Sequence, residues 1–280
     1  MRKIKSKTII SIVEELCAGA NFELPEDVLT SLEHKVFLEN NIAKNVLKEI
    51  VENASIAKKE QIPLCQDTGT ANFFVKFGKN VRIDGEEDIY SSINKGVSSG
   101  YTKYYLRKSI VSDPIERDNT KDNTPANIYL TLVDGDKIEI TFLPKGGGSE
   151  NASALEMFIP SLGWNGVKEF TLSVVNNKGR NACPPLIIGL GIGGDFSSVG
   201  LLSKKALLRK IGSENIDPFY NKKEKELLKD INNLNIGPMN MGGKTTALAI
   251  FIETSPVHIA SLPVAVSIQC HSCRRKTVVI

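Results

Sequence analysis

Three consecutive glycines at 146–148 follow directly after a strand-like run at 137–143. Because glycine has no Cβ, such a loop can adopt backbone conformations that other residues avoid, and a ligand can lie directly against its backbone. Successive N–H groups in the loop can also converge on an anion. Lys145 before the triplet and Ser149 after it make the stretch polar. The triplet therefore predicts either a flexible turn or an anion-binding loop at the end of a strand.

The composition of the chain is that of an ordinary globular protein. Of its 280 residues, 41% are hydrophobic and 24% are charged, and the net charge is only +3. So small a charge, without a basic face carrying interleaved aromatic residues, does not predict a nucleic-acid partner. No apolar run reaches the roughly 18 residues that a membrane helix needs, and the basic N-terminus lacks the apolar region of a signal peptide. We therefore expect a cytoplasmic protein that binds neither nucleic acid nor membrane.

Hydrophobic periodicity predicts a helical N-terminal segment over about residues 1–60, followed by mixed strands and helices. The elements expected next are a strand at 72–78, a helix at 86–106, a surface loop at 109–126, and strands at 128–133 and 137–143. Asp134-Gly135 between the last two strands is a strong hairpin signal. We therefore expect those two strands to pair with each other.

The second half of the chain continues the alternation of helices and strands. Its expected elements are helical stretches over 154–175 broken at Gly163 and Gly166, a buried strand at 186–190, helices at 198–209 and 224–234, and strands at 247–253 and 264–269. No repeat and no linker is visible. We therefore expect the α+β class, with mixed β-sheets surrounded by helices and an N-terminal helical segment, in a single domain over residues 1–280.

Two glycine-rich stretches partly match nucleotide-binding motifs. Residues 189–194 match the G-x-G-x-x-G pattern, but the acidic residue expected about 20 positions later should end a strand, and Glu214 lies in a polar turn instead. Residues 242–246 resemble a phosphate-binding loop, but Pro238 stands where its first glycine is required, and no strand is expected before it. Neither stretch is interpreted as a nucleotide site.

Five cysteines are an odd number for a disulfide scaffold, so we expect thiols with chemistry of their own. Cys65, Cys183 and Cys270 each stand at a strand edge beside proline, glycine or polar residues, and they could converge on one site. Three thiolates suit a [4Fe–4S] cluster with one open iron, which can polarise a substrate hydroxyl. Cys270 with Cys273 would also suit zinc, although no second such pair is present. Cys17 lies in a helical pattern and is expected to be a packing or surface residue.

Several irregular motifs in the chain point to one known family. They are PLCQDTG at 63–69, KGGGS at 145–149, ACPP at 182–185, GGKTT at 242–246, H-x-A-S-x-P-V at 258–264, and QC at 269–270 followed by RR at 274–275. In these motifs the chain resembles the class I iron–sulfur hydro-lyases, the family of fumarate hydratase and L-tartrate dehydratase, in its alpha-subunit type. The resemblance extends over nearly all 280 residues.

The resemblance implies an active site. Cys65, Cys183 and Cys270 would hold a [4Fe–4S] cluster with one open iron. Asp67 and His258 would be catalytic and would manage the proton of the substrate hydroxyl. The residues expected to bind substrate are Gln66, Arg107, Gly146, Gly147 and Gly148. Cys273 matches no cluster ligand of the family, and we interpret it as a spare thiol.

For three of these residues, a purely structural role without contact to substrate is also open. Asp67 could cap a turn, Arg107 could be a solvated charge at a helix end, and His258 could be structural. The base that removes the C3 proton of the substrate is not identified in this chain. A non-catalytic iron–sulfur protein is a further alternative, but such a protein would not need the polar residues that follow the first cysteine.

The resemblance implies reversible hydration of a C4 dicarboxylate, with fumarate to (S)-malate as the main expectation. L-tartrate is the alternative, because malate and tartrate present two carboxylates and a hydroxyl at the same spacing; mesaconate is possible too. In fused relatives a second domain supplies further substrate contacts, and this chain ends at Ile280. We therefore expect a separate beta subunit and a dimer of alpha–beta pairs.

Overall fold

The computed structural model describes residues 1–280, and their contacts group into two compact units. Unit 1 comprises Met1–Pro25, Ala54–Gly147 and Arg274–Ile280, and unit 2 comprises Glu26–Asn53 and Gly148–Cys273. Both units combine helices with β-sheet, which confirms the α+β class. The expected organisation as a single domain stays a prediction.

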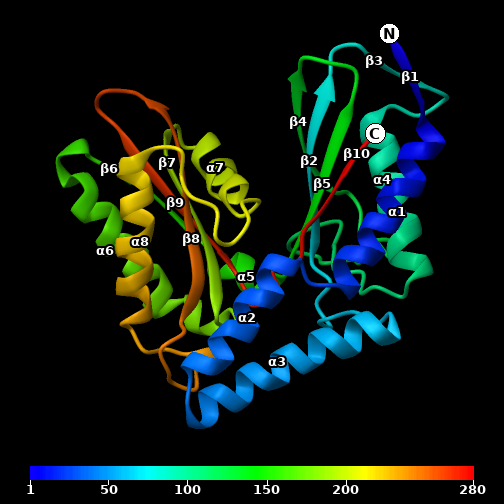
Figure 1. Cartoon of the computed structure of the whole chain (residues 1–280). Coiled ribbons are helices and arrows are strands. Elements are labelled where there is room, and N and C mark those ends of the chain that lie inside the picture. Colours follow the sequence, from blue (N-terminus) through cyan, green and yellow to red (C-terminus); the bar gives the residue numbers. More distant parts are fainter. The chain divides into compact units, whose positions relative to one another are not determined.

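Unit 1 is built around a four-stranded sheet in the order β10-β5-β2-β4 (Figure 1). Its elements are β1 (Arg2–Lys5), α1 (Ser6–Phe22), β2 (Thr70–Gly78), β3 (Val81–Asp84), α4 (Ile89–Lys103), β4 (Asn127–Val133), β5 (Ile138–Lys145) and β10 (Lys276–Val279). The short strands β1 and β3 pair in parallel as a separate ribbon. No regular element occupies the surface loop expected at 109–126, in agreement with the sequence.

Helices α1 and α4 pack closely against each other in the core of unit 1. A Cβ on Gly96 would lie 2.6 Å from Cβ of Val13, and a Cβ on Gly100 would lie 2.9 Å from Cβ of Cys17. The helices can therefore approach this closely only because α4 carries glycine at both positions. Cys17 is fully buried at this crossing, which confirms that it packs, and burial raises the pKa of its thiol.

The expected hairpin between 128–133 and 137–143 is wrong. Strand β2 lies between the two strands, parallel to β4 and antiparallel to β5. The Asp-Gly turn forms, but it wraps around the end of β2: Lys79 N–H donates to Val133 O, and Asn80 N–H donates to Gly135 O. Strand β2 therefore occupies the central position and pairs with β4 on one edge and with β5 on the other. Most of its residues are buried there.

Unit 2 contains a second four-stranded sheet, in the order β6-β9-β7-β8. Its elements are α2 (Glu26–Leu38), the first part of α3 (Asn41–Glu60), α5 (Gly147–Asn151, whose first residue belongs to unit 1), β6 (Ala154–Phe158), α6 (Gly163–Asn177), β7 (Leu186–Gly194), α7 (Ser198–Ala206), α8 (Pro218–Asn232), β8 (Ala247–Val257) and β9 (Leu262–Gln269). Helices α6 and α8 pack on one face of the sheet and α7 packs on the other (Figure 1).

Two expectations for unit 2 need correction. Residues 154–158 were expected to be helical but form the edge strand β6, because all five pair with β9 and this pairing outweighs their helix propensity. The expected break is found at Gly163, whose φ of 49° separates a short 3-10 helix at Pro160–Leu162 from α6, and Gly166 lies in the first turn of α6. The helix expected at 224–234 begins six residues earlier, where Asp217 caps Phe219 N–H and Pro218 occupies the first turn.

The glycine pattern at 189–194 belongs to helix packing. Gly189 and Gly191 lie inside β7, and α7 crosses directly over them. A Cβ on Gly189 would lie 2.0 Å from the carbonyl oxygen of Ser203, and a Cβ on Gly191 would lie 2.6 Å from that of Val199. These glycines therefore serve the contact between strand and helix, which agrees with the rejection of a dinucleotide site.

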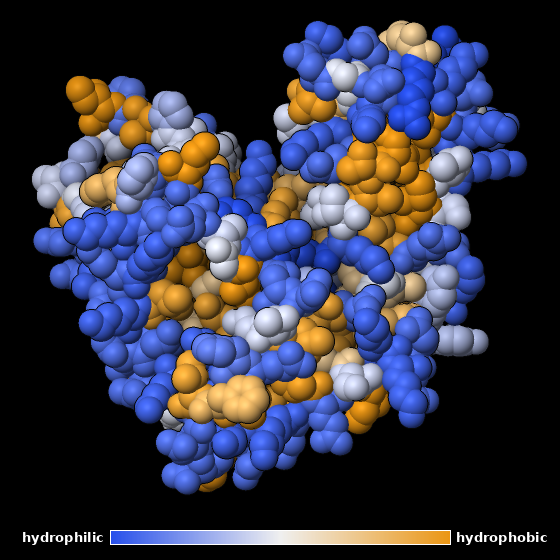
Figure 2. Space-filling view, viewed as in Figure 1, coloured by the Kyte–Doolittle hydropathy of each residue, from blue (hydrophilic) through white to orange (hydrophobic).

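The corner between α2 and α3 exposes an apolar patch in unit 2. Phe37, Leu38 and Ile42 are exposed by 80%, 45% and 63%. Figure 2 shows apolar side chains, in orange, over this corner. Among the helices of the structure, none has the length and apolar character needed to cross a membrane.

Candidate active site

The turn that carries Cys65, at 65–69 in unit 1, is held by buried side chains. Tyr101 Oη donates to the carbonyl oxygens of Thr68 at 2.9 Å and Gly69 at 3.2 Å. Asn123 Nδ2 also donates to Gly69 O, at 3.2 Å. Tyr101 and Asn123 are both fully buried. These hydrogen bonds from buried side chains fix the backbone of the turn. Within the turn, Cys65 is half-buried and Gln66 is exposed.

Arg274 anchors the same turn from the C-terminal segment of unit 1. Arg274 is 1% exposed, and its guanidinium donates to Asn21 Oδ1 at 2.8 Å and to the carbonyl oxygen of Asp67 at 2.9 Å. Asn21 in turn accepts Leu64 N–H at 2.8 Å. Sequence reasoning gave Arg274 no role, although it lies in the RR motif; its burial is the property that the sequence did not reveal.

The Asp67 carboxylate accepts backbone hydrogen bonds on both oxygens. Gly69 N–H donates to Oδ1 at 3.0 Å, and Gly147 N–H donates to Oδ2 at 2.7 Å. A Cβ on Gly146 would lie 3.0 Å from Oδ2, so a side chain there would crowd the carboxylate. The last two glycines of the triplet begin the five-residue helix α5, and the carboxylate that the Gly147 amide binds is that of Asp67.

Arg107 lies beside the turn through its backbone. Thr68 Oγ1 donates to the carbonyl oxygen of Arg107 at 2.9 Å. Helix α4 ends at Lys103, so Arg107 is not at the helix end that the sequence predicted. Its side chain is exposed. A cation in this position is available to a ligand carboxylate.

In unit 2 the structure brings Cys183 and Cys270 together. Ile187 and Gln269 are partners in the antiparallel pairing of β7 and β9, so the two cysteines flank the same end of neighbouring strands. His271 N–H donates to the carbonyl oxygen of Cys183 at 3.2 Å, and His271 Nδ1 lies 3.0 Å from that oxygen. The two segments are therefore tied directly to each other.

The second part of the glycine loop is tied to the same strand end. Ser149 Oγ donates to Gln269 Oε1 at 3.2 Å. Ser153 Oγ donates to the carbonyl oxygen of Ser149 at 3.0 Å and accepts Ile268 N–H at 3.1 Å. These bonds hold Gly148 and Ser149 at the end of β9, next to Cys270.

His258 is not brought to that end. It lies exposed in the turn between β8 and β9, where its Nδ1 accepts Ala260 N–H at 3.2 Å. An acceptor at Nδ1 places the proton of the neutral ring on Nε2. Strand β9 has eight residues and therefore rises roughly 26 Å, so His258 and Cys270 lie at opposite ends of it.

Comparison with known proteins identifies the family. The family model described as fumarate hydratase (Fumerase) matches residues 10–279. The chain belongs to this family. It is 45% identical over 273 residues, 95% of either chain, to the putative L(+)-tartrate dehydratase subunit alpha of Methanocaldococcus jannaschii. It is 31% identical over 277 residues to the L(+)-tartrate dehydratase subunits alpha of Escherichia coli strain K12 and Shigella sonnei strain Ss046, covering 97% of this chain and 90% of each relative.

Membership of the fumarate hydratase family makes the chain a hydro-lyase and confirms the resemblance drawn from its motifs. The family is one of iron–sulfur enzymes, so the donors of the chain can be tested against such a cluster. None of the five cysteines forms a disulfide, and thiolates are the ligands that iron–sulfur clusters take. Cys183 is exposed and Cys270 is half-buried at one strand end, whereas Cys273 is fully buried. The donor set of unit 2 therefore fits two cluster ligands.

The third expected ligand of this fumarate hydratase family member, Cys65, belongs to unit 1. No group of three or more His, Cys, Asp or Glu side chains arranged to hold a metal ion is found in the structure. The site residues thus fall into two sets. Unit 1 carries Cys65, Gln66, Asp67, Arg107, Gly146 and Gly147, and unit 2 carries Gly148, Cys183, His258 and Cys270.

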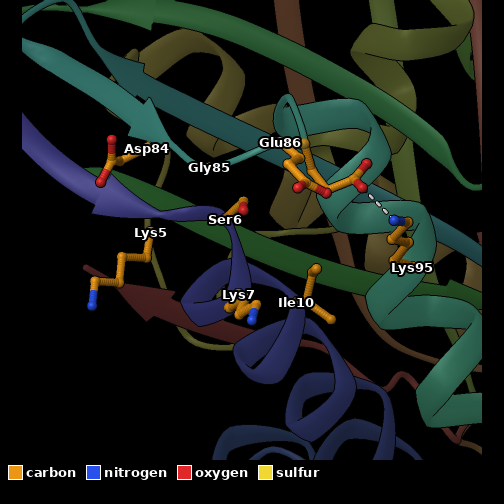
Figure 3. A pocket seen from close by; sticks show the side chains of 9 residues that line it. Lys5, Ser6, Lys7, Ile10, Asp84, Gly85, Glu86 and Lys95 are labelled. Atoms are coloured by element: carbon orange, nitrogen blue, oxygen red, sulfur yellow. Dashed lines mark hydrogen bonds and ion pairs between the residues drawn. The ribbon is translucent and has the colours of Figure 1, made fainter.

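A cavity of about 500 Å³ in unit 1 contains none of these residues. It lies at the start of α1 and is lined by side chains of both charges, among them Lys7, Asp84 and Glu86 (Figure 3). Glu87 and Lys95 form an ion pair on its wall. Since the family motifs and the cysteines all lie elsewhere, this cavity is not the candidate active site of the hydro-lyase.

Proposed function

We propose that this chain is the cluster-bearing subunit of a hydro-lyase that interconverts fumarate and (S)-malate. Cys65, Cys183 and Cys270 would hold a [4Fe–4S] cluster with one open iron. The observation that carries the proposal is the pairing of the Cys183 and Cys270 segments at one strand end, with both thiols accessible from solvent. Such a cluster supplies a Lewis acid that makes the substrate hydroxyl a better leaving group.

Asp67 is the proposed proton acceptor and donor at the substrate hydroxyl. Each of its oxygens already accepts one backbone N–H, from Gly69 and from Gly147, so the orientation of the carboxylate is fixed. A carboxylate oxygen can accept a second hydrogen bond, so each oxygen keeps capacity for the substrate hydroxyl. A preoriented carboxylate of this kind suits general acid–base catalysis.

The substrate carboxylates would be held by Arg107, Gln66 and the glycine loop. Arg107 offers a guanidinium that can bind a carboxylate in a bidentate manner. Because Gly147 N–H donates to Asp67, a substrate carboxylate bound by the loop would rely on Gly146 and Gly148 or share the Gly147 amide with Asp67. This division gives the loop two functions, which are orienting the catalytic carboxylate and binding the substrate.

L(+)-tartrate is a second candidate substrate, and the names of the relatives favour it. The relatives in Escherichia coli and Shigella sonnei are named L(+)-tartrate dehydratase subunit alpha, and the relative in Methanocaldococcus jannaschii carries the same name with the word putative. Tartrate differs from malate by one hydroxyl, and selectivity at that level depends on a few placed polar groups.

A beta subunit is the proposed partner, because the same relatives are named as alpha subunits. We also propose a cytoplasmic location, which is supported by five cysteines without a disulfide.

His258 lies about one strand length from Cys270, so within the proposed dimer of alpha–beta pairs it would serve the site of the second copy. Co-expression of His258→Ala with Cys183→Ser chains would then restore part of the activity that each variant lacks alone.

The experiment that tests the function is an anaerobic assay of the reconstituted chain with and without a beta-subunit chain. We expect turnover of (S)-malate or L(+)-tartrate only when both chains are present, and the ratio of kcat/KM for the two acids would assign the substrate. Appreciable turnover by the single chain would contradict the need for a partner. A cluster that forms but turns over neither acid with its partner would favour the non-catalytic alternative.

A further inference from the structure

Cys183 has a backbone conformation that its own residue type does not favour. Its φ is 52°, in the left-handed region, where residues other than glycine, asparagine and aspartate are uncommon. Such a conformation persists only when the surrounding structure imposes it, and such residues gather at functional sites. For Cys183 the constraint comes from hydrogen bonds to its own backbone and to that of Pro184.

Two segments of unit 2 fix the backbone on the C-terminal side of Cys183. Met239 N–H donates to the carbonyl oxygen of Pro184 at 2.8 Å. The carbonyl of Cys183 itself receives His271 N–H at 3.2 Å and faces His271 Nδ1 at 3.0 Å. Because a carbonyl oxygen can only accept, the ring must carry its proton on Nδ1 in this contact. One residue thus offers two donors to one carbonyl.

We propose that His271 is a positioning residue that sets the direction of the Cys183 thiol relative to Cys270. His271 follows Cys270 directly in the chain, so the same short segment supplies one proposed ligand and fixes the backbone of another. The proposal rests on the proposed function, because it takes both cysteines to be cluster ligands. It assigns His271 no contact with substrate and no role as a ligand.

The chemistry of the contact defines the variants. In His271→Ala the backbone N–H still reaches Cys183 O, but the ring donor is lost, so the left-handed backbone of Cys183 is less well held. In His271→Asn the side-chain Nδ2 stands close to the position of Nδ1 and can donate to the same oxygen. His34→Ala is the matched control, because His34 is an exposed histidine on α2 without a part in the site.

The test is the rate of iron release to a chelator after anaerobic reconstitution of the four chains: wild type, His271→Ala, His271→Asn and His34→Ala. We expect release from His271→Ala to be at least about tenfold faster than from wild type, as for other residues that orient metal ligands. His271→Asn and His34→Ala should release iron at nearly the wild-type rate. The thermal unfolding of the cluster-free chains should be alike in all four.

Four outcomes would overturn the proposal. If His271→Ala releases iron at the wild-type rate, His271 does not position the ligand, although the cluster itself stands. If His271→Asn releases iron as fast as His271→Ala, or if faster iron release accompanies a lowered unfolding temperature, the side-chain donor to the Cys183 carbonyl does not explain the effect. If wild type takes up no cluster, the proposed function fails, and the role of His271 fails with it.

Discussion

At the scale of single residues, backbone amides and buried side chains hold the candidate site residues that were predicted from the sequence. Asp67 shows this most clearly, because its two oxygens accept N–H groups from Gly69 and Gly147. The two interpretations of Asp67 drawn from the sequence, a turn cap and a catalytic carboxylate, are therefore compatible. The bond from Gly69 closes the turn, and the bond from Gly147 orients the carboxylate toward the glycine loop.

Asp67→Asn is expected to lower kcat by about 10²–10⁴-fold, because the amide is a poor proton acceptor. One end of the amide would also place an NH₂ against a backbone N–H, which leaves two donors facing each other. The measurement is kcat for (S)-malate and L(+)-tartrate with the beta subunit present, together with the iron content of the chain. We expect the iron content to stay at the wild-type level.

Asp113→Asn is the matched control for this variant. Asp113 lies in the surface loop of unit 1 and accepts two backbone N–H groups, from Ile115 at 2.7 Å and Glu116 at 2.8 Å. It therefore resembles Asp67 as a turn residue but has no part in the site. Equal kcat for Asp67→Asn and Asp113→Asn would show that Asp67 only closes a turn.

At the scale of elements, long periodic segments were predictable and tertiary pairings were not. The helices of the N-terminal segment and the buried strand β7 follow from their own sequences. The central position of β2 does not, because the Asp134-Gly135 signal is local and the competing pairing comes from residues more than 50 positions away. Strand β6 was missed for the same reason, since its pairing with β9 outweighs a sequence of helix formers.

The candidate site divides in the same way. The cysteines, Asp67 and the glycine loop were found because rare residue types stand together in short motifs. Arg274 was missed as a contributor because its role depends on burial beneath the Cys65 turn. His271 was missed because the carbonyl that it binds belongs to a segment 88 positions away in the chain.

The contact of α7 with β7 is expected to fail when Gly189 is replaced. In Gly189→Ala the new Cβ would lie 2.0 Å from a backbone oxygen of α7, so the helix must shift away from the sheet. We expect a loss of about 1–3 kcal/mol or more in the free energy of unfolding, measured with denaturant. Gly200→Ala within α7 is the control, because its new Cβ would lie 4.0 Å from Cδ1 of Leu155; it should gain about 0.5–1 kcal/mol in the free energy of unfolding. Similar effects of both changes would contradict the packing role of Gly189.

The start of α7 should give unit 2 a pH-dependent contribution to stability. Asp195 accepts hydrogen bonds from the Ser198 hydroxyl and from the N–H groups of Ser197 and Ser198, and these lower its pKa to about 2. A lowered folded-state pKa stabilises the fold above the unfolded value of about 3.9, and the gain is lost as the pH falls toward 2. We therefore expect Asp195→Ala to lower the melting temperature at pH 7, with a difference from wild type that shrinks between about pH 4 and 2. A difference independent of pH would contradict this assignment.

At the scale of the whole chain, the proposed ligands are drawn from both compact units. The chain passes from unit 1 to unit 2 within the glycine triplet, and it returns to unit 1 between Cys273 and Arg274. Two motifs of the candidate site therefore coincide with these crossings. The family match runs from residue 10 to residue 279 and therefore covers segments of both units.

The central claim is that three thiolates of this chain, and no others, hold an iron–sulfur cluster. The most direct measurement is the content of iron and labile sulfide after anaerobic reconstitution, with the visible spectrum, for wild type, Cys183→Ser and Cys273→Ser. We predict about four irons and four sulfides per chain and a broad absorption near roughly 400 nm, retained in Cys273→Ser and lost in Cys183→Ser. Stoichiometric zinc without labile sulfide, or a full cluster in Cys183→Ser, would contradict the claim.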